Sequence, residues 1–217
     1  MPIPSMAGVL ASGGAGSSGA VFVTSANYDR PGSGSQAISF SGMSAGQLAI
    51  IWNVSNGARP SASGWNAINT GAYNLGYPVT LLWKVLTSAD ISAGSVTVTA
   101  DAGFFTVQAW LGPTSAAVVS AADANGAPGY VTIPGYTKSG SFKGLIGLAS
   151  LQNNGSGATT LVGPGTMVNR ISNYQSTFFL ATVADILNPA NYTDGTAITF
   201  TANGSYFGLY GQLVELT

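Results

Sequence analysis

The sequence contains no cysteine and no histidine, and charged residues are scarce. Without cysteine there is no disulfide and no thiolate metal site, and without histidine the commonest general base is missing. Six basic and seven acidic residues make up 6% of the 217-residue chain, against about 25% in a typical soluble domain. The basic residues are scattered, so no phosphate-binding surface is predicted and nucleic acid is not an expected partner.

Long apolar runs are also missing, although the mean hydropathy is +0.31. No stretch approaches the roughly 20 apolar residues that a membrane-spanning helix needs. Residues 1–20 lack the basic region and the continuous apolar region of a signal peptide. We therefore predict no membrane partner. A surface with so few charges has little repulsion between copies, which favours a homo-oligomer or a larger assembly.

Helical patterns are scarce as well, because no sustained apolar stripe and no capping box leading into one is recognisable. Instead the chain has 30 glycines, and short β-branched runs recur between turn signals. This pattern predicts an all-β fold, an antiparallel β-sandwich of the jelly-roll or immunoglobulin-like type. The predicted strands are 47–54, 79–85, 95–100, 104–111, 144–151, 176–183, 197–202 and 206–216.

Segments of the first half recur in the same order in the second half. AGQLAII at 45–51 resembles FKGLIGL at 142–148, where Leu48 and Leu145 stand 97 residues apart, and three later pairs follow at similar spacing. A duplication explains this order, giving two pseudo-repeats. The predicted organisation is an N-terminal arm or flexible leader at 1–19 and β-sandwich repeats at 20–113 and 114–217, or two halves of one pseudo-symmetric domain. The arm either lies on a neighbouring subunit or is frayed.

No catalytic or metal-binding arrangement is recognisable. The lysines of IPGYTKSGSFK do not have the Ser-x-x-Lys spacing of a serine–lysine nucleophile, and no two carboxylates suggest an acid–base pair. The Asx-Gly turns lack the ligand density of a calcium loop. We predict no enzyme activity, no catalytic residue, no metal and no cofactor. A hydrolase built from distant carboxylates is the remote alternative.

Aromatic side chains are the remaining candidates for a contact surface. Trp52 and Trp83 are in phase with aliphatic residues and are assigned to the core. Matching the two repeats assigns Phe105, Val107, Ala109 and Leu111 to the core. Trp65 follows Gly64 and either packs over the open end of the sandwich or is exposed. The outward phase holds Trp110, Tyr206 and Tyr210, which with Trp65 form the predicted contact set for a protein interface or a glycan.

Several short motifs occur in a fixed order. They are Gly46-Gln47-Leu48, Pro60, Gly64-Trp65, Trp83-Lys84, Asp90 and Trp110-Leu111-Gly112. In this order the chain resembles, from about Val21 to Thr217, a β-rich repeat module of phage virion proteins and some bacterial surface proteins. Gln47 stands where the module usually has an acidic residue, and the second half has Gly165-Thr166 in place of Gly-Trp.

The resemblance implies a non-enzymatic structural protein of a bacteriophage virion. The sequence has no long coiled-coil or fibre stem, which favours the capsid surface over the tail. Decoration or cementing of the capsid is the favoured role, with the major capsid protein, other virion proteins and further copies as partners. A tail or fibre component that binds a host glycan is the first alternative, and an extracellular bacterial adhesion module is the second. Within this module Gly64-Trp65 is expected to close the sandwich end. Lys84 is expected on the outer face of its strand, where its charge discourages edge pairing.

Overall fold

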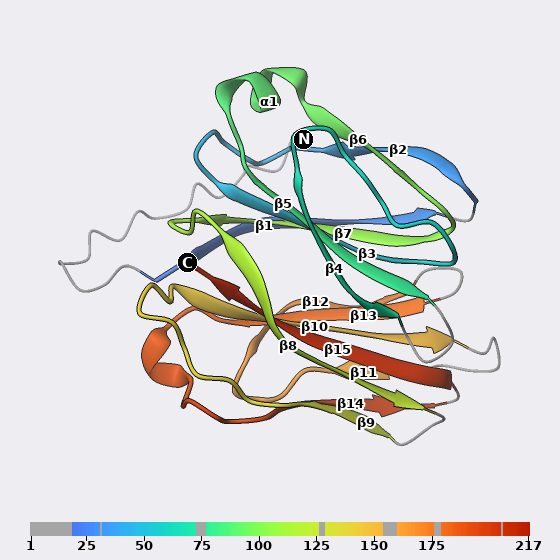
Figure 1. Cartoon of the computed structure of the whole chain (residues 1–217), viewed down its shortest axis with the longest axis vertical. Coiled ribbons are helices and arrows are strands. Elements are labelled where there is room, and N and C mark those ends of the chain that lie inside the picture. The colour runs from blue at the N-terminus through green and yellow to red at the C-terminus, as the bar shows by residue number, and fades with distance from the viewer. Residues whose placement is uncertain are drawn as a thin grey trace, which may run out of the picture.

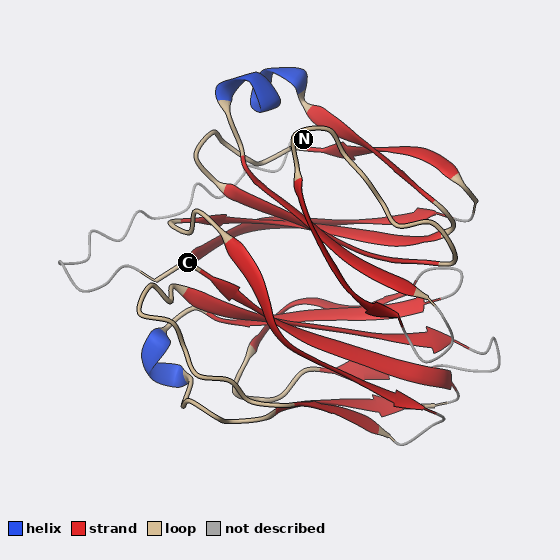
Figure 2. Cartoon of the chain, in the orientation of Figure 1, coloured by secondary structure: helices blue, strands red, loops and turns tan. Residues whose placement is uncertain are grey.

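The computed structural model describes residues 19–30, 32–72, 77–125, 129–153, 160–175, 179–204 and 206–217. The predicted leader therefore lies, apart from Gly19, outside the described residues. Within these ranges the chain is nearly all strand, and every strand pairing is antiparallel (Figure 2). The prediction of an all-β antiparallel sandwich is confirmed.

The strands follow one another with short connections. The first half forms β1 (Val21–Arg30), β2 (Gly34–Ser39), β3 (Leu48–Ser55), β4 (Asn66–Ala72), β5 (Pro78–Val85), α1 (Ser88–Ala93), β6 (Ser95–Ala100) and β7 (Gly103–Leu111). The second half forms β8 (Ala116–Asn125), β9 (Tyr130–Ile133), β10 (Gly144–Asn153), β11 (Thr160–Val162), β12 (Val168–Gln175), β13 (Phe179–Ile186), the 3-10 helix η1 (Pro189–Asn191), β14 (Ile198–Asn203) and β15 (Tyr206–Leu216).

The described strands form a stack of four sheets (Figure 1). The first outer sheet is β2-β6, the first inner sheet is β1-β7-β3-β5-β4, the second inner sheet is β12-β13-β10-β15-β8, and the second outer sheet is β11-β14-β9. Figure 1 shows them in this order from top to bottom, with α1 above and η1 at the left. In a single sandwich one face of each sheet is exposed to solvent. Here each inner sheet is covered on one face by the other inner sheet and on the opposite face by an outer sheet.

Three apolar layers hold the stack together. The central layer joins the two inner sheets and contains Trp52, Phe104 and Trp110 of the first half with Phe179 and Tyr210 of the second. One outer layer lies between the first outer and first inner sheets, and another lies between the second inner and second outer sheets. Because alternate residues of a strand face opposite sides, each inner strand contributes side chains to two apolar layers. Its sequence is therefore a nearly continuous apolar run.

The two inner sheets share one strand order. Read from β8, the second inner sheet runs β8-β15-β10-β13-β12, and each strand holds the place of its counterpart in β1-β7-β3-β5-β4. The residue match at a spacing of 97 is nevertheless wrong in register, because Leu48 lies in the central layer and Leu145 in an outer layer. A shift of one residue reverses the face of a strand. Duplication of the sequence stays a prediction.

A short helix was not expected from the sequence. Thr87 and Asp90 form a capping box at the start of α1, in which each side chain accepts a hydrogen bond from the other's backbone N–H. Gly94 ends the helix with a left-handed φ of 73°. At six residues the helix has no room for the apolar stripe that sequence patterns need.

Candidate functional site

Three of the four predicted contact residues are buried. Trp110, Tyr206 and Tyr210 all have exposed fractions of 5% or less, so the prediction that they face outward is wrong. Phe105, Val107 and Ala109 do face a core, as predicted, but Leu111 is exposed. For Trp110 and Tyr210 the cause is the covered inner sheet, because their side of the strand meets the other half of the chain instead of solvent. Tyr206 lies in the outer layer of the second half, beyond a register shift between β10 and β15.

These buried aromatics make internal contacts. The Trp110 ring packs edge-on against Phe22 with 6.0 Å between ring centroids. The Tyr210 hydroxyl donates a hydrogen bond to Gln212 Oε1 at 3.0 Å, and the Tyr206 hydroxyl accepts one from the Gly129 backbone N–H at 2.7 Å. Buried tyrosines usually satisfy their hydroxyls in this way. Their role is to hold the stack together.

Trp65 lies apart from the other three, and it is half-buried. Its ring stacks on Phe40 at 6.3 Å and packs against the outer layer of the first half. Gly64 precedes it with a φ of 76°, a left-handed conformation that glycine adopts at little cost. Trp65 therefore covers the end of the first outer layer, as predicted for a closure of the sandwich end.

Lys84 does not protect a sheet edge, because β5 lies between β3 and β4 in the first inner sheet. Its ammonium group binds Asp90 Oδ1 at 2.6 Å, which ties β5 to the first turn of α1. The hydrogen bond from Lys84, and next the one from Thr87, lowers the pKa of Asp90 to about 2. The pair anchors the helix and offers no free charge to a ligand.

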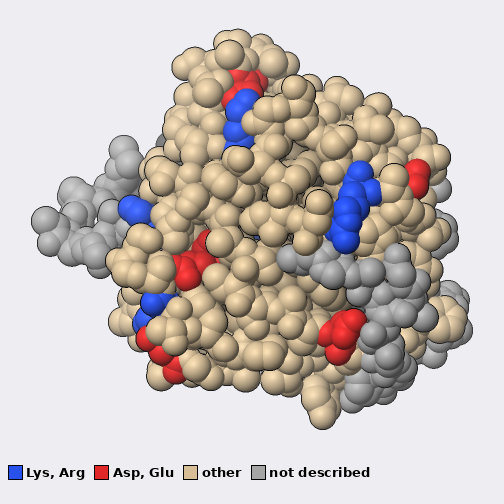
Figure 3. Space-filling model, in the orientation of Figure 1, with Lys and Arg blue, Asp and Glu red and all other residues tan. Residues whose placement is uncertain are grey.

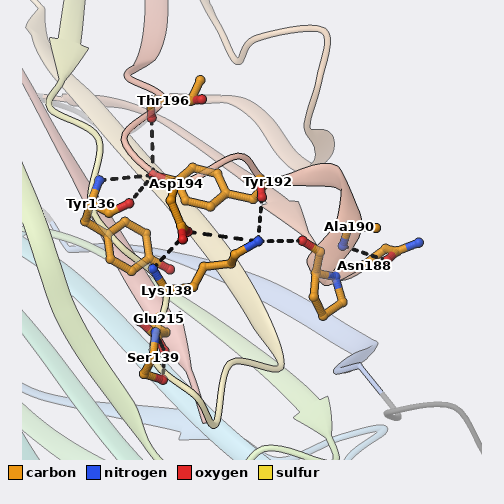
Figure 4. A network of polar contacts seen from close by, with 10 residues as sticks. Tyr136, Lys138, Ser139, Asn188, Ala190, Tyr192, Asp194, Thr196 and Glu215 are labelled. Atoms are coloured by element: carbon orange, nitrogen blue, oxygen red, sulfur yellow. Dashed lines mark hydrogen bonds and ion pairs between the residues drawn. The ribbon is translucent and has the colours of Figure 1, made fainter.

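A second polar cluster surrounds Lys138 at the end of the second half (Figure 4). Lys138 Nζ donates to the Pro189 and Tyr192 carbonyl oxygens at 3.0 and 2.6 Å and lies 4.0 Å from Asp194 Oδ1. It also lies 5.7 Å from the centre of the Phe142 ring. These contacts fasten the segment between β9 and β10 to the turn that carries η1. Because carbonyl groups already engage Lys138, the cluster is a structural support.

Two further residues in this cluster have shielded polar groups. Burial, and next the Glu215 carboxylate, raises the pKa of Tyr136 far above its usual range, so its hydroxyl stays protonated. Glu215 is almost fully buried and accepts hydrogen bonds from the backbone N–H of Ser139, at 3.2 Å, and from its hydroxyl. Figure 4 shows these side chains directed toward one another inside the loop. Neither group is placed to act as a base on a bound molecule.

Among the described residues, no group of three or more aspartate or glutamate side chains is arranged to hold a metal ion. In the same part of the chain, no helix has the length and apolar character to cross a membrane.

The second outer sheet carries exposed apolar side chains on a charge-free surface. Tyr130 on β9 and Val162 on β11 both pair with Thr201 of β14, one from each side, and they are 54% and 49% exposed. We define the outer face as the outward residues of these strands: Tyr130, Thr132, Thr160, Val162, Thr199, Thr201 and Asn203. The hydroxyls of Thr132 and Thr199 are hydrogen-bonded at 2.9 Å. The outer face combines an exposed aromatic ring with an exposed aliphatic side chain and hydroxyl groups, so it is a candidate contact surface. Val21 and Leu111, which pair between β1 and β7, form a second exposed apolar pair.

The first outer sheet presents a similar surface without large side chains. Its outward residues pair as Ser35 with Thr99, Ala37 with Thr97 and Ser39 with Ser95. Figure 3 shows that charged side chains on the visible side of the molecule form small separate groups on a largely uncharged surface. The sequence did not point to the outer face, because β9 and β11 are only four and three residues long.

Comparison with protein-family models, curated protein sequences and solved structures found no match to this chain. The resemblance to the virion repeat module therefore stays a prediction. The structural features that bear on function are the four-sheet stack and the outer face.

Proposed function

We propose that the chain is a non-enzymatic structural protein of a bacteriophage virion, which decorates or cements the capsid through its outer face. The observation that carries the proposal is the exposed pair Tyr130 and Val162 on a sheet face without any charged residue. Contact surfaces between proteins are depleted in charge at their centres and enriched in aromatic residues.

The attachment works by removing the outer face from water. Burying apolar surface contributes about 25 cal/mol per Å², so Tyr130 and Val162 give only a weak contact for one copy. Specific interfaces bury about 800 Å² on each partner, which is more than three short strands offer. A symmetric shell repeats the contact many times, and linked copies bind far more tightly than single ones. Neighbouring copies and the major capsid protein are therefore the expected partners.

The edges of the two inner sheets are poor candidates for this attachment. Register shifts interrupt the pairing of β1, β4, β8 and β12, the four edge strands of the inner sheets. Such bulges twist an edge and discourage the addition of a further strand. With few charges available for that purpose, these irregular edges favour contact through sheet faces.

The proposal is tested with particles that lack the chain and purified chain added back. Tyr130→Lys places a charge in the outer face and should lower the number of bound copies roughly tenfold, as loss of a central aromatic contact does. Thr97→Lys is the matched control, because Thr97 is also an exposed strand residue but lies on the first outer sheet. Equal binding of the two variants would exclude the outer face as the attachment surface.

Binding of a host glycan is the second candidate function, in a tail or fibre component. It is favoured by Tyr130, an exposed ring beside the hydroxyls of Thr132, Thr199 and Thr201 on a flat sheet. An aromatic face next to hydrogen-bonding groups suits a sugar ring. A glycan-array signal that Tyr130→Ala removes and Trp65→Ala retains would support this function. Arrays without any signal would count against it.

A further inference from the structure

A buried ion pair lies where the two inner sheets meet. Arg170 Nε on β12 binds Asp185 Oδ2 on β13 at 2.6 Å. Asp185 is only 1% exposed, and burial raises its pKa, although Arg170 acts in the opposite direction. Both residues belong to the second half of the chain. A charge this deep in a sheet-to-sheet contact is costly unless it is well paired.

The first half of the chain completes this site. The Arg170 guanidinium lies over the Phe22 ring, 4.5 Å from its centre, and Phe22 packs on Trp110. The nearby Trp110 indole also acts to lower the pKa of Asp185, although neither Trp110 Nε1 nor Asp185 Oδ1 has a hydrogen-bond partner among the described residues. We call Phe22, Trp110, Arg170 and Asp185 the cross-half cluster. Two of its members come from each inner sheet.

The strand pairing shows where the counterparts of these residues lie. One row across the first inner sheet reads Phe22, Trp110, Leu48, Val85. The corresponding row of the second inner sheet reads Val118, Val214, Ile146, Asp185. At equivalent positions of the two rows, β7 carries Trp110 where β15 carries Val214. Likewise, β5 carries Val85 where β13 carries Asp185.

The two rows lie in opposite directions across the central layer. β1 lies against β12 and β4 lies against β8, so the Trp110 end of one row meets the Asp185 end of the other. At the opposite edge, Val85, Val118 and Val214 belong to the same apolar layer. The contact between the halves is therefore polar and aromatic at one edge and aliphatic at the other.

We propose that the cross-half cluster makes the first half dock only on a second half, and so prevents two like halves from pairing. Two second halves facing each other would place Val214 on Asp185, which leaves the carboxylate without the indole and Arg170 without an aromatic ring. Two first halves would place Trp110 and Phe22 on Val85, where the surfaces do not match. Specificity arises here by penalising the wrong partner, a role that buried polar groups have in some interfaces.

This selectivity matters for a protein that is crowded with its own copies. The halves are joined only by the short segment 112–115 between β7 and β8, so exchange of halves between chains is a simple route to wrong dimers. The cluster restricts any exchange to unlike halves. The inference does not depend on the proposed function, because it concerns how the chain folds on itself.

The test uses the full chain with an apolar replacement of the pair, Asp185→Val with Arg170→Met. Two differently tagged populations are mixed, unfolded in urea, refolded together and captured through one tag. We expect the double variant to fold but to retain roughly ten times more of the second tag than the unaltered chain, since the penalty for pairing like halves is gone. The matched control is Asp90→Val with Lys84→Met. This removes a second 2.6 Å ion pair, which lies outside the central layer.

Equal co-capture by the double variant and the unaltered chain would overturn the proposal. If the double variant fails to fold, Asp185→Asn with Arg170→Gln is used, because it keeps polar side chains of similar length and removes both charges of the pair. It should still raise co-capture above that of the Asp90 control. Exchanged halves persist on dilution, whereas contacts between outer faces dissociate, so dilution before capture separates this result from the proposed assembly.

Discussion

Four of the six cations make close polar contacts inside the fold. Lys84 binds Asp90, and Arg170 binds Asp185. Arg59 donates to the Val79 carbonyl oxygen at 2.6 Å, and Lys138 donates to two backbone carbonyls. Each of these contacts fixes a loop, a helix or a sheet rather than presenting a free charge to solvent. At the scale of single residues, the few charges of the chain thus stabilise the internal structure, and the outward faces of the two outer sheets carry none.

The Asp90 contact makes a pH-dependent contribution to stability. Its pKa is lowered from 3.8 to about 2, so the contribution is complete above pH 4 and is lost as the pH falls through 2. Asp90→Asn should lower the free energy of unfolding by about 1 kcal/mol at pH 7, the usual cost of a lost helix cap. Urea titrations should show almost no difference at pH 2. Asp123→Asn, at an exposed strand position, is the control.

The buried aromatics give a second residue-scale prediction. Trp110→Ala should lower the free energy of unfolding by about 3–5 kcal/mol, because it empties a large volume in the central layer. Tyr130→Ala removes a ring that is mostly exposed and should change it by less than about 1 kcal/mol. Thermal unfolding of the two variants compares them directly. Similar losses would mean that Trp110 is not in the core.

At the scale of elements, glycines in the second inner sheet allow the second outer sheet to pack closely. A Cβ at Gly147 would lie 2.8 Å from the Phe200 ring, and one at Gly211 would lie 2.8 Å from Ile133 Cδ1. Phe200 is on β14 and Ile133 is on β9, the strands that carry most of the outer face. The position of the outer face therefore depends on these two glycines.

Gly211→Ala should push β9 outward and lower the free energy of unfolding by about 1–3 kcal/mol, as overpacking of a core does. Amide hydrogen exchange should become faster in β9 and β14 but not in β2 and β6, which belong to the other end of the stack. Gly165→Ala is the control, because a Cβ there meets open space. Uniformly faster exchange across all four sheets would contradict a local effect.

The sequence predicted the apolar strands well and the polar strands poorly. The run at 206–216 was predicted with the observed bounds of β15, and 95–100 with those of β6. β2 and β4 were not predicted, because Ser, Asn, Gly and Thr occupy much of their length and the apolar alternation is weak. β9 and β11 were missed because they have only four and three residues, and β1, β8 and β12 were missed as well. Their strand conformation depends on pairing with neighbours that are distant in sequence.

The candidate site was harder to predict than the fold for a related physical reason. Assigning Trp110 and Tyr210 to an outward face assumed one wet face per strand, and the docking of the two halves removes that face from solvent. Tyr130 was passed over because its strand has four residues. Which aromatic side chain is exposed is decided by how the layers stack, and local sequence carries no information on that.

At the scale of the whole molecule, four sheets enclose three apolar layers. The outward strand residues of both outer sheets are uncharged. Lys138 and Arg170 are engaged within the fold, and an exposed apolar pair, Tyr130 and Val162, lies at one end of the stack. This combination supports a building block that acts through repeated weak contacts in an assembly, with the outer face as the contact surface.

The most direct test of this role is the number of copies of the chain in purified virus particles, determined by quantitative mass spectrometry against the major capsid protein. We predict a copy number in simple ratio to the capsid subunit, as repeated attachment over a symmetric shell requires. A handful of copies per particle would contradict decoration and favour a tail position. Absence of the chain from particles would contradict the virion role altogether.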